Sequence, residues 1–181
     1  VEITVNGAND APVTGGNDSA SGSEDDPLIS GTVPAATDVD VETVTYELVA
    51  GSVEVDSSPA PDGTITFNGD GSYSYDPSGD QDLDDTETRV ITFRYVATDG
   101  TADSAEATVT ITVNGANDAP VTGGDDAASG SEDVALISGT VPAATDVDVE
   151  IVTYELVAGS VEVDGSPPPD GTVTFNGDGS Y

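Results

Sequence analysis

The chain has 181 residues, of which 36 are acidic and only two, Arg89 and Arg94, are basic, so its formal net charge at pH 7 is −34. This balance excludes binding to nucleic acid or to an anionic membrane surface, since both need clusters of lysine and arginine. Cysteine, histidine and lysine are absent, which excludes disulfides, thiol nucleophiles, histidine bases and Schiff-base chemistry. The excess of carboxylates favours cation binding, or life in high salt where self-repulsion is screened.

The elements predicted along the chain are all β-strands, because apolar residues recur with a period of two and nowhere with the 3.6-residue spacing of a helix. The two predicted strands nearest the end of the first repeat show this period most clearly. In the first of them, Ile91, Phe93 and Tyr95 lie on one face. In chain order, the predicted strands are Leu28–Val33, Thr43–Ala50, Ser52–Asp56, Gly63–Phe67, Ser72–Asp76, Thr88–Ala97 and Ala102–Val113.

A tight hairpin is predicted at Asn68–Gly71, where Asn-Gly-Asp-Gly supplies residues that tolerate positive φ. About 100 residues carrying seven antiparallel strands, each with one apolar face, predict an all-β fold, a seven-stranded Greek-key sandwich of two sheets. We expect its largest core residues to be Tyr46, Phe67, Phe93 and Tyr95.

The chain is a tandem repeat. Val1–Tyr73 reappears as Val109–Tyr181 with nine substitutions, and a period of this length is the size of one small domain. We therefore expect three parts: residues 1–10 as the last strand of a preceding repeat plus a linker, residues 11–114 as a complete repeat, and residues 115–181 as an incomplete second repeat. The incomplete repeat should not fold alone unless a neighbouring chain supplies its missing strands.

The acidic residues gather in the loops between the predicted strands. Asp38 and Asp40 form a D-x-D pair whose carboxylates point the same way if the segment is extended. Calcium takes six to eight oxygen ligands from carboxylates, amides and backbone carbonyls, so several loops brought together by the fold could form a calcium site. For any single aspartate in so acidic a chain, a solvated surface charge is the plainer interpretation.

Four phrases carry a resemblance to a known family: ISGTVPAATDVD, DGTITFNGDGSYSYDP, TFRYVATDG and VTITVNGANDAP. Together they resemble the cadherin-like, VCBS-type repeats of giant RTX-class bacterial surface adhesins, and more distantly the cadherins. The resemblance covers essentially the whole repeat and implies a cadherin/immunoglobulin-like sandwich that binds Ca²⁺ at the junction between successive domains.

The resemblance also implies the ligands of that calcium. Glu24 and Glu132 resemble the acidic ligand that cadherins carry near the start of each domain. Asp85 and Glu87 resemble the cadherin D-x-E motif before the penultimate strand, with Asp84 or Asp82 as alternatives to Asp85. The sequence departs from the cadherin linker at Gly115 and Ala116, where cadherins carry polar residues. The remaining ligands implied are Asn9, Asp10, Asp38, Asp40, Asp99, Asn117, Asp118, Asp146 and Asp148.

The function expected from this resemblance is structural. The repeats would be calcium-rigidified extenders in the stalk of a large secreted adhesin that attaches cells to surfaces or biofilms, with adjacent repeats as partners and no catalysis. Two alternatives stay open: an extracellular fibre subunit completed by strand exchange with other copies of the chain, and a module that binds a glycan or a protein. No stretch approaches the roughly 20 apolar residues needed for membrane insertion.

Overall fold

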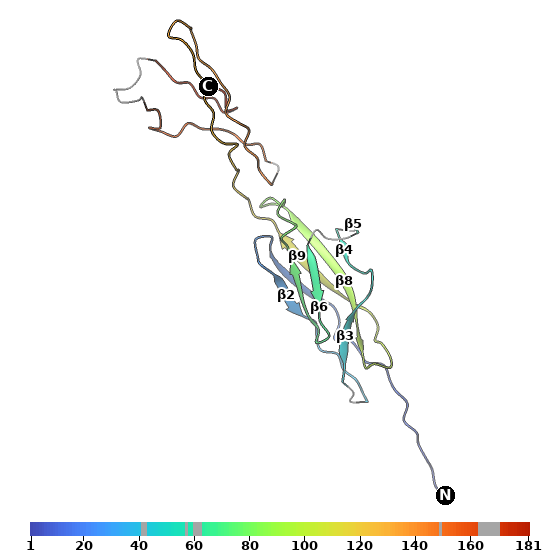
Figure 1. The fold of residues 1–181 in the computed structure, drawn as a ribbon. Coiled ribbons are helices and arrows are strands. Elements are labelled where there is room, and N and C mark those ends of the chain that lie inside the picture. The colour runs from blue at the N-terminus through green and yellow to red at the C-terminus, as the bar shows by residue number, and fades with distance from the viewer. Residues whose placement is uncertain (41–42, 57, 60–62, 149, 163–170) are drawn as a thin grey trace. The chain divides into compact units, whose positions relative to one another are not determined.

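The computed structural model describes residues 1–181 except 41–42, 57, 60–62, 149 and 163–170. The chain divides into two compact units, unit 1 from Val1 to Asn117 and unit 2 from Asp118 to Tyr181. Among the described residues every regular element is a β-strand, and every strand lies in unit 1 (Figure 1). No helix in the described part of the chain is long and apolar enough to cross a membrane.

Unit 1 is a sandwich of two sheets, as the sequence predicts. The smaller sheet has the order β2-β7-β6, and the larger has the order β1-β9-β8-β4-β5, with β3 also paired to β8. The strands are β1 (Asp18–Ser23), β2 (Ile29–Thr32), β3 (Thr45–Leu48), β4 (Glu54–Val55), β5 (Ser58–Pro59), β6 (Thr64–Phe67), β7 (Ser72–Asp76), β8 (Thr88–Thr98) and β9 (Ala107–Asn114).

All seven predicted strands are present, and two more are added. The first, β1, runs parallel to β9 from Asp18 opposite Val109 to Ser23 opposite Asn114, and the second, β5, pairs with β4. The sequence DSASGS of β1 carries no apolar alternation, so its strand is set by pairing with β9 and gives no local signal. The predicted start of the last strand at Ala102 is five residues early, because Ala102 closes a turn with Asp99.

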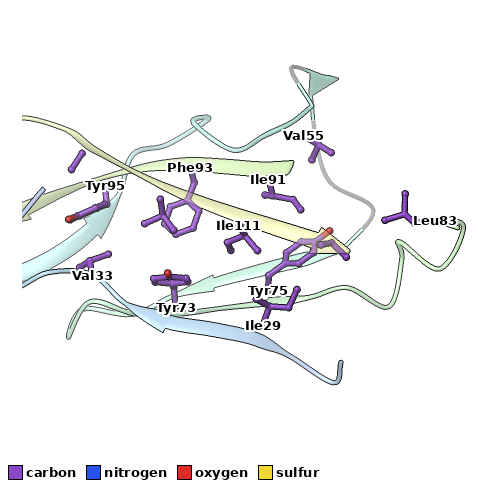
Figure 2. Packing of buried hydrophobic residues seen from close by; sticks show 13 residues of the cluster. Ile29, Val33, Val55, Tyr73, Tyr75, Leu83, Ile91, Phe93, Tyr95 and Ile111 are labelled. Atoms are coloured by element: carbon purple, nitrogen blue, oxygen red, sulfur yellow. The ribbon is translucent and has the colours of Figure 1, made fainter. Parts of the chain in front are cut away.

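The core lies between the two sheets. Phe93 from β8 meets Tyr73 from β7 edge to face, with ring centroids 5.7 Å apart, and Figure 2 shows these two side chains facing each other across the sandwich. Of the four predicted core aromatics, Phe93 and Tyr95 are fully buried, whereas Tyr46 and Phe67 are partly buried against the cluster. Tyr75 is also fully buried and Tyr73 is buried. Burial of an apolar side chain such as that of Phe93 stabilises the fold by about 1.5–3 kcal/mol.

Two tyrosine hydroxyls reach from the core to the amino-terminal segment. Tyr73 donates to the Asp18 carboxylate at 2.6 Å, and Tyr95 donates to the Gly16 carbonyl oxygen at 2.6 Å. Buried hydroxyls need such partners, because leaving one unpaired costs about 1–3 kcal/mol. These two bonds therefore fix β1 against the sandwich although its own side chains are small and polar.

The predicted hairpin turn forms between β6 and β7. The amide of Gly71 donates to the Asn68 carbonyl at 2.9 Å, and Gly71 has φ +84, a conformation that favours glycine. The Asp70 carboxylate accepts a 2.9 Å bond from the Ser72 amide. The turn thus closes on itself through backbone and side-chain bonds.

Unit 2 has no strand among its described residues. It has the isolated bridges Val121 to Thr145 and Thr140 to Ser180. Ile137 is 45% exposed, whereas its sequence counterpart Ile29 in unit 1 is 3% exposed. The same repeat sequence therefore buries this isoleucine in unit 1 and leaves it exposed in unit 2.

Candidate functional site

The first candidate site is the amino-terminal acidic group, which we define as Asn9, Asp10, Asp38, Asp40 and Asp99. The side-chain amide of Asn9 donates to Asp99 Oδ2 at 2.9 Å, and the backbone amide of Asp10 donates to Asp40 Oδ2 at 2.7 Å. The segment before β1 is thus tied to two loops that lie about 30 and 90 residues further along the chain. Five predicted ligands belong to one connected part of unit 1.

The D-x-D pair forms a turn rather than an extended segment. The amide of Asp40 donates to Asp38 Oδ1 at 2.8 Å, which is the local bond of an Asx turn. The other oxygen, Asp38 Oδ2, is buried and has no hydrogen-bond partner in the described residues. A buried, unpartnered carboxylate oxygen is costly, so this atom is suited to a cation.

The Asp99 carboxylate is held by the loop between β8 and β9. Its Oδ1 accepts bonds from the amides of Thr101 at 2.6 Å and Ala102 at 2.8 Å. The hydrogen bond from Asn9, followed by those from the two backbone amides, lowers the pKa of Asp99. Asp99 therefore stays ionised, which is the form that binds metal.

The second candidate site centres on Glu24, which is only 2% exposed. Glu24 Oε2 accepts a bond from the Leu83 amide at 3.2 Å, and Glu24 Oε1 accepts one from the Ala116 amide at 2.6 Å. The Glu24 amide itself donates to the Asn114 carbonyl at 3.0 Å. The carboxylate is thereby fixed against the last residues of unit 1.

The D-x-E segment lies in the loop before β8, near this second site. Asp84 accepts a 2.7 Å bond from the Thr86 amide, and the Glu87 carbonyl accepts a 3.0 Å bond from the Gly115 amide. The bonds from the Thr86 side chain and backbone lower the pKa of Asp84. Asp85 and Glu87 have exposed side chains, so their role as ligands stays a prediction.

Unit 2 reproduces part of the amino-terminal acidic group. The Asp118 amide donates to Asp148 Oδ2 at 2.7 Å, as Asp10 donates to Asp40 in unit 1. The Asp148 amide donates to Asp146 Oδ1 at 3.1 Å, and Asp148 Oδ1 is buried without a hydrogen-bond partner in the described residues. Asn117 and Glu132 are exposed; the residues that hold Glu24 in unit 1 have no counterparts around Glu132 within the 181 residues.

The donor set of both sites consists of oxygen atoms, which suit a hard cation such as Ca²⁺. Nevertheless, no three carboxylates among the described residues lie close enough together to hold a metal ion as they stand. The predicted ligands are gathered in connected groups, but the groups are pinned to backbone amides instead of converging on one point. The individual ligand assignments stay predictions.

Sequence reasoning missed the groups that support Glu24. These groups are the backbone amides of Leu83 and Ala116, and a pattern of side chains cannot predict a backbone donor. The buried cluster of Asp80, Tyr75 and Arg89 was also missed, although one signal was present: Arg89 is one of only two cations in the chain and follows an acidic loop. The sequence does not show which of the two arginines has a buried partner, since Arg94 pairs with Glu106 on an exposed face.

The two-sheet sandwich with acidic loops defines a module of the cadherin-like class. A model of the bacterial cadherin-like domain matches residues 9–115, which include all nine strands. The chain therefore belongs to the bacterial cadherin-like domain family. Membership indicates an extracellular, adhesion-type structural module, and domains of this class typically bind calcium.

Other comparisons add little. No curated protein matches the chain. A solved structure of a nucleoside hydrolase-related hypothetical protein from Saccharophagus degradans, described as associated with carbohydrate metabolism, is 15% identical with a TM-score of 0.35. The match covers 60% of this chain and spans only 26% of that one. A likeness at this level carries no argument about function.

Proposed function

We propose that the chain is a calcium-stiffened extender segment in the stalk of a large secreted bacterial adhesin, with a mechanical and non-catalytic role in attachment to surfaces or biofilms. Its partners in this role are the adjacent repeats of the same chain. The observation that carries the proposal recurs in both units: a linker aspartate amide is bonded to the second aspartate of a D-x-D pair. Among the described residues, each pair also has one buried carboxylate oxygen without a hydrogen-bond partner, on Asp38 in unit 1 and on Asp148 in unit 2.

The linker supports the proposal because its backbone amides bond one carboxylate within each unit. The Ala116 amide bonds Glu24 in unit 1, and the Asp118 amide bonds Asp148 in unit 2. Calcium bound at these carboxylates would neutralise part of their charge. Without the cation, the carboxylates repel one another in a chain of net charge −34.

In this role the chain's own residues have distinct tasks. Asp38, Asp40 and Asp99 would supply carboxylate oxygens in unit 1, as would Asp146 and Asp148, the equivalents of Asp38 and Asp40, in unit 2. Glu24 would supply the carboxylate of the second candidate site. Bound calcium would supply charge neutralisation and a rigid link. Extracellular calcium modules bind at roughly 10⁻⁴–10⁻³ M, so the segment would be empty inside a cell and loaded outside it.

The test is a calcium titration of the 181-residue chain by isothermal calorimetry. The variant D38N/D148N removes one charge from each of the two residues with unpartnered oxygens, and D70N, in the hairpin turn, is the matched control. We expect the double variant to weaken calcium binding about tenfold or more and the control to bind as the parent does. Equal binding by all three chains would contradict the proposed sites.

A further inference from the structure

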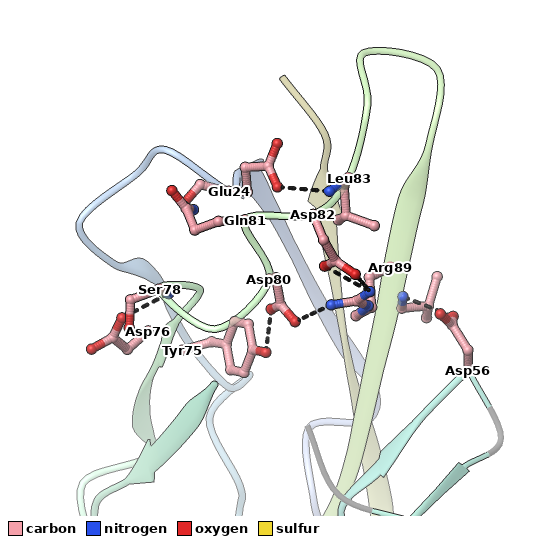
Figure 3. Close-up of polar contacts among 11 residues, drawn as sticks. Glu24, Asp56, Tyr75, Asp76, Ser78, Asp80, Gln81, Asp82, Leu83 and Arg89 are labelled. Atoms are coloured by element: carbon pink, nitrogen blue, oxygen red, sulfur yellow. Dashed lines mark hydrogen bonds and ion pairs between the residues drawn. The ribbon is translucent and has the colours of Figure 1, made fainter. Parts of the chain in front are cut away.

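An ionic cluster of Asp80, Asp82 and Arg89 lies beside Glu24, and neither Asp80 nor Arg89 is one of the predicted calcium ligands. Asp80 is fully buried and accepts hydrogen bonds from the Tyr75 hydroxyl and from Arg89 Nη1, the latter at 2.6 Å. Arg89 Nη2 also lies 3.2 Å from Asp82 Oδ1. Figure 3 shows the Arg89 side chain reaching from β8 to both aspartates.

The cluster contains one of the two basic residues of the chain. The chain has two cations, and the other, Arg94, pairs with Glu106 on an exposed face of the sandwich. Burying an ion pair costs desolvation energy that its attraction barely offsets. A chain with 36 acidic residues thus places one of its two cations in a position that adds little net stability, which points to a role in geometry.

Arg89 and Glu24 are both hydrogen-bonded to the short segment Asp80–Leu83. Arg89 holds its first and third residues, Asp80 and Asp82. Glu24 is held by the second and fourth: Gln81 Nε2 donates to the Glu24 carbonyl at 2.6 Å, and the Leu83 amide donates to Glu24 Oε2 at 3.2 Å. This short segment, which turns at Gln81 and Asp82, therefore bridges Arg89 and Glu24 through these hydrogen bonds.

We propose that Arg89 is a positioning residue for cation binding at Glu24, acting through the Asp80–Leu83 segment. This inference rests on the proposed function. Residues that orient metal ligands from behind typically change metal affinity by 10–100-fold when removed. Here the guanidinium group fixes Asp80 and Asp82, and these fix the Leu83 amide that aims the Glu24 carboxylate.

The experiment measures calcium affinity of the 181-residue chain by calorimetry in a double-mutant cycle between Arg89 and Glu24. Because R89Q alone leaves Asp80 charged and unpaired, and so endangers folding, the cycle uses D80N/R89Q, in which both charges are removed together. R94Q is the matched control, because it removes the other cation from the same strand. Circular dichroism verifies that each variant keeps its β-structure.

We expect D80N/R89Q to weaken calcium binding about tenfold and to speed amide exchange at Leu83 but not at Val109 in the core. In an E24Q background the same pair should change affinity little, since its effect passes through Glu24. R94Q should bind calcium as the parent does.

Two results would overturn the inference, and they differ. If E24Q weakens binding while D80N/R89Q does not, or if D80N/R89Q weakens it equally with and without Glu24, Arg89 does not position Glu24 although calcium binds. If the parent chain binds no calcium, the proposed function fails as well.

Discussion

At the residue scale, Glu24 is the side chain on which the carboxyl-terminal part of unit 1 depends. It is 2% exposed, and its two oxygens accept bonds from separate backbone amides, those of Leu83 and Ala116. Glutamine has the same shape but presents an NH₂ group to one of these donors. The charge and one hydrogen bond are lost together.

We therefore predict that E24Q lowers the free energy of unfolding by about 1–3 kcal/mol in the absence of calcium, measured by urea denaturation. The matched control is E106Q, which breaks the exposed pair with Arg94 and should cost at most about 1 kcal/mol. Equal effects of the two changes would show that Glu24 is not a structural anchor.

The buried tyrosines predict how stability depends on alkaline pH. Burial, followed by the hydrogen bond to a carboxylate, raises the pKa of Tyr73 and Tyr75 well above the ordinary 10.0, and burial also raises the pKa of Tyr95. A pKa raised in the folded state means that the folded chain holds these protons more tightly. The stability they confer is complete below pH 10 and is lost as pH rises toward their folded pKa.

Absorbance at 295 nm should therefore show part of the tyrosine ionising only well above pH 10, together with the loss of β-structure in circular dichroism. In concentrated urea, all tyrosines should ionise near pH 10. The prediction fails if every tyrosine of the native chain ionises near pH 10 while the β-structure persists.

At the scale of elements, strand prediction succeeded where side chains alternate and failed where they do not. Ile91, Phe93 and Tyr95 all lie fully buried on one face of β8, because a two-residue period and a single core face leave no other arrangement. β1 has only small and polar residues, and its pairing with β9 joins segments about 90 residues apart. Such a strand has no local signature.

The same distinction applies to the candidate site. The sequence shows that Asp38, Asp40 and Asp99 are carboxylates in predicted loops, and the family resemblance implied that they are calcium ligands. It could not show that Glu24 is held by backbone amides, since these carry no side-chain signal. Nor could it show that the D-x-D pair is a turn whose amide bonds Asp38, because that depends on backbone angles.

The linker glycine gives a prediction at this scale. A Cβ on Gly115 would lie 2.0 Å from the Asp84 carbonyl oxygen and 2.7 Å from that of Leu83, whereas a Cβ on Gly7, in the same Asn-Gly-Ala-Asn context, would meet nothing within 4 Å. A side chain at position 115 would therefore clash with the backbone of the loop before β8. G115A should lower the unfolding free energy by about 1–3 kcal/mol.

Urea denaturation of G115A and G7A makes the comparison, because the two changes are chemically identical and share their neighbours in sequence. G7A should leave stability unchanged. If both variants lose stability alike, the cost is that of the sequence context and not of packing against the loop before β8.

At the scale of the whole molecule, one sequence is seen in two environments. Ile29 is 3% exposed in unit 1 and its counterpart Ile137 is 45% exposed in unit 2. Protection of backbone amides follows burial and strand pairing. Hydrogen exchange should therefore find the Tyr75 and Ile111 amides of unit 1 slow, and the described residues of unit 2 fast; slow exchange throughout unit 2 would contradict this difference.

The net charge of −34 acts on the whole chain and makes ionic conditions decisive. Monovalent salt screens repulsion between exposed carboxylates without regard to their position. A specifically bound cation instead stabilises the folded state according to its affinity and concentration. The two effects can be separated by holding ionic strength constant while exchanging the cation.

The most direct test of specific calcium binding, on which the proposed stiffening depends, is thus a calorimetric melt of the 181-residue chain in millimolar calcium, compared with excess chelator and with sodium chloride of equal ionic strength. Calcium at about ten times the dissociation constant of a site adds about 1.4 kcal/mol. We predict that calcium raises the unfolding temperature well beyond sodium chloride, and that D38N/D148N abolishes much of the difference. Equal melting in calcium and in sodium chloride would contradict the account.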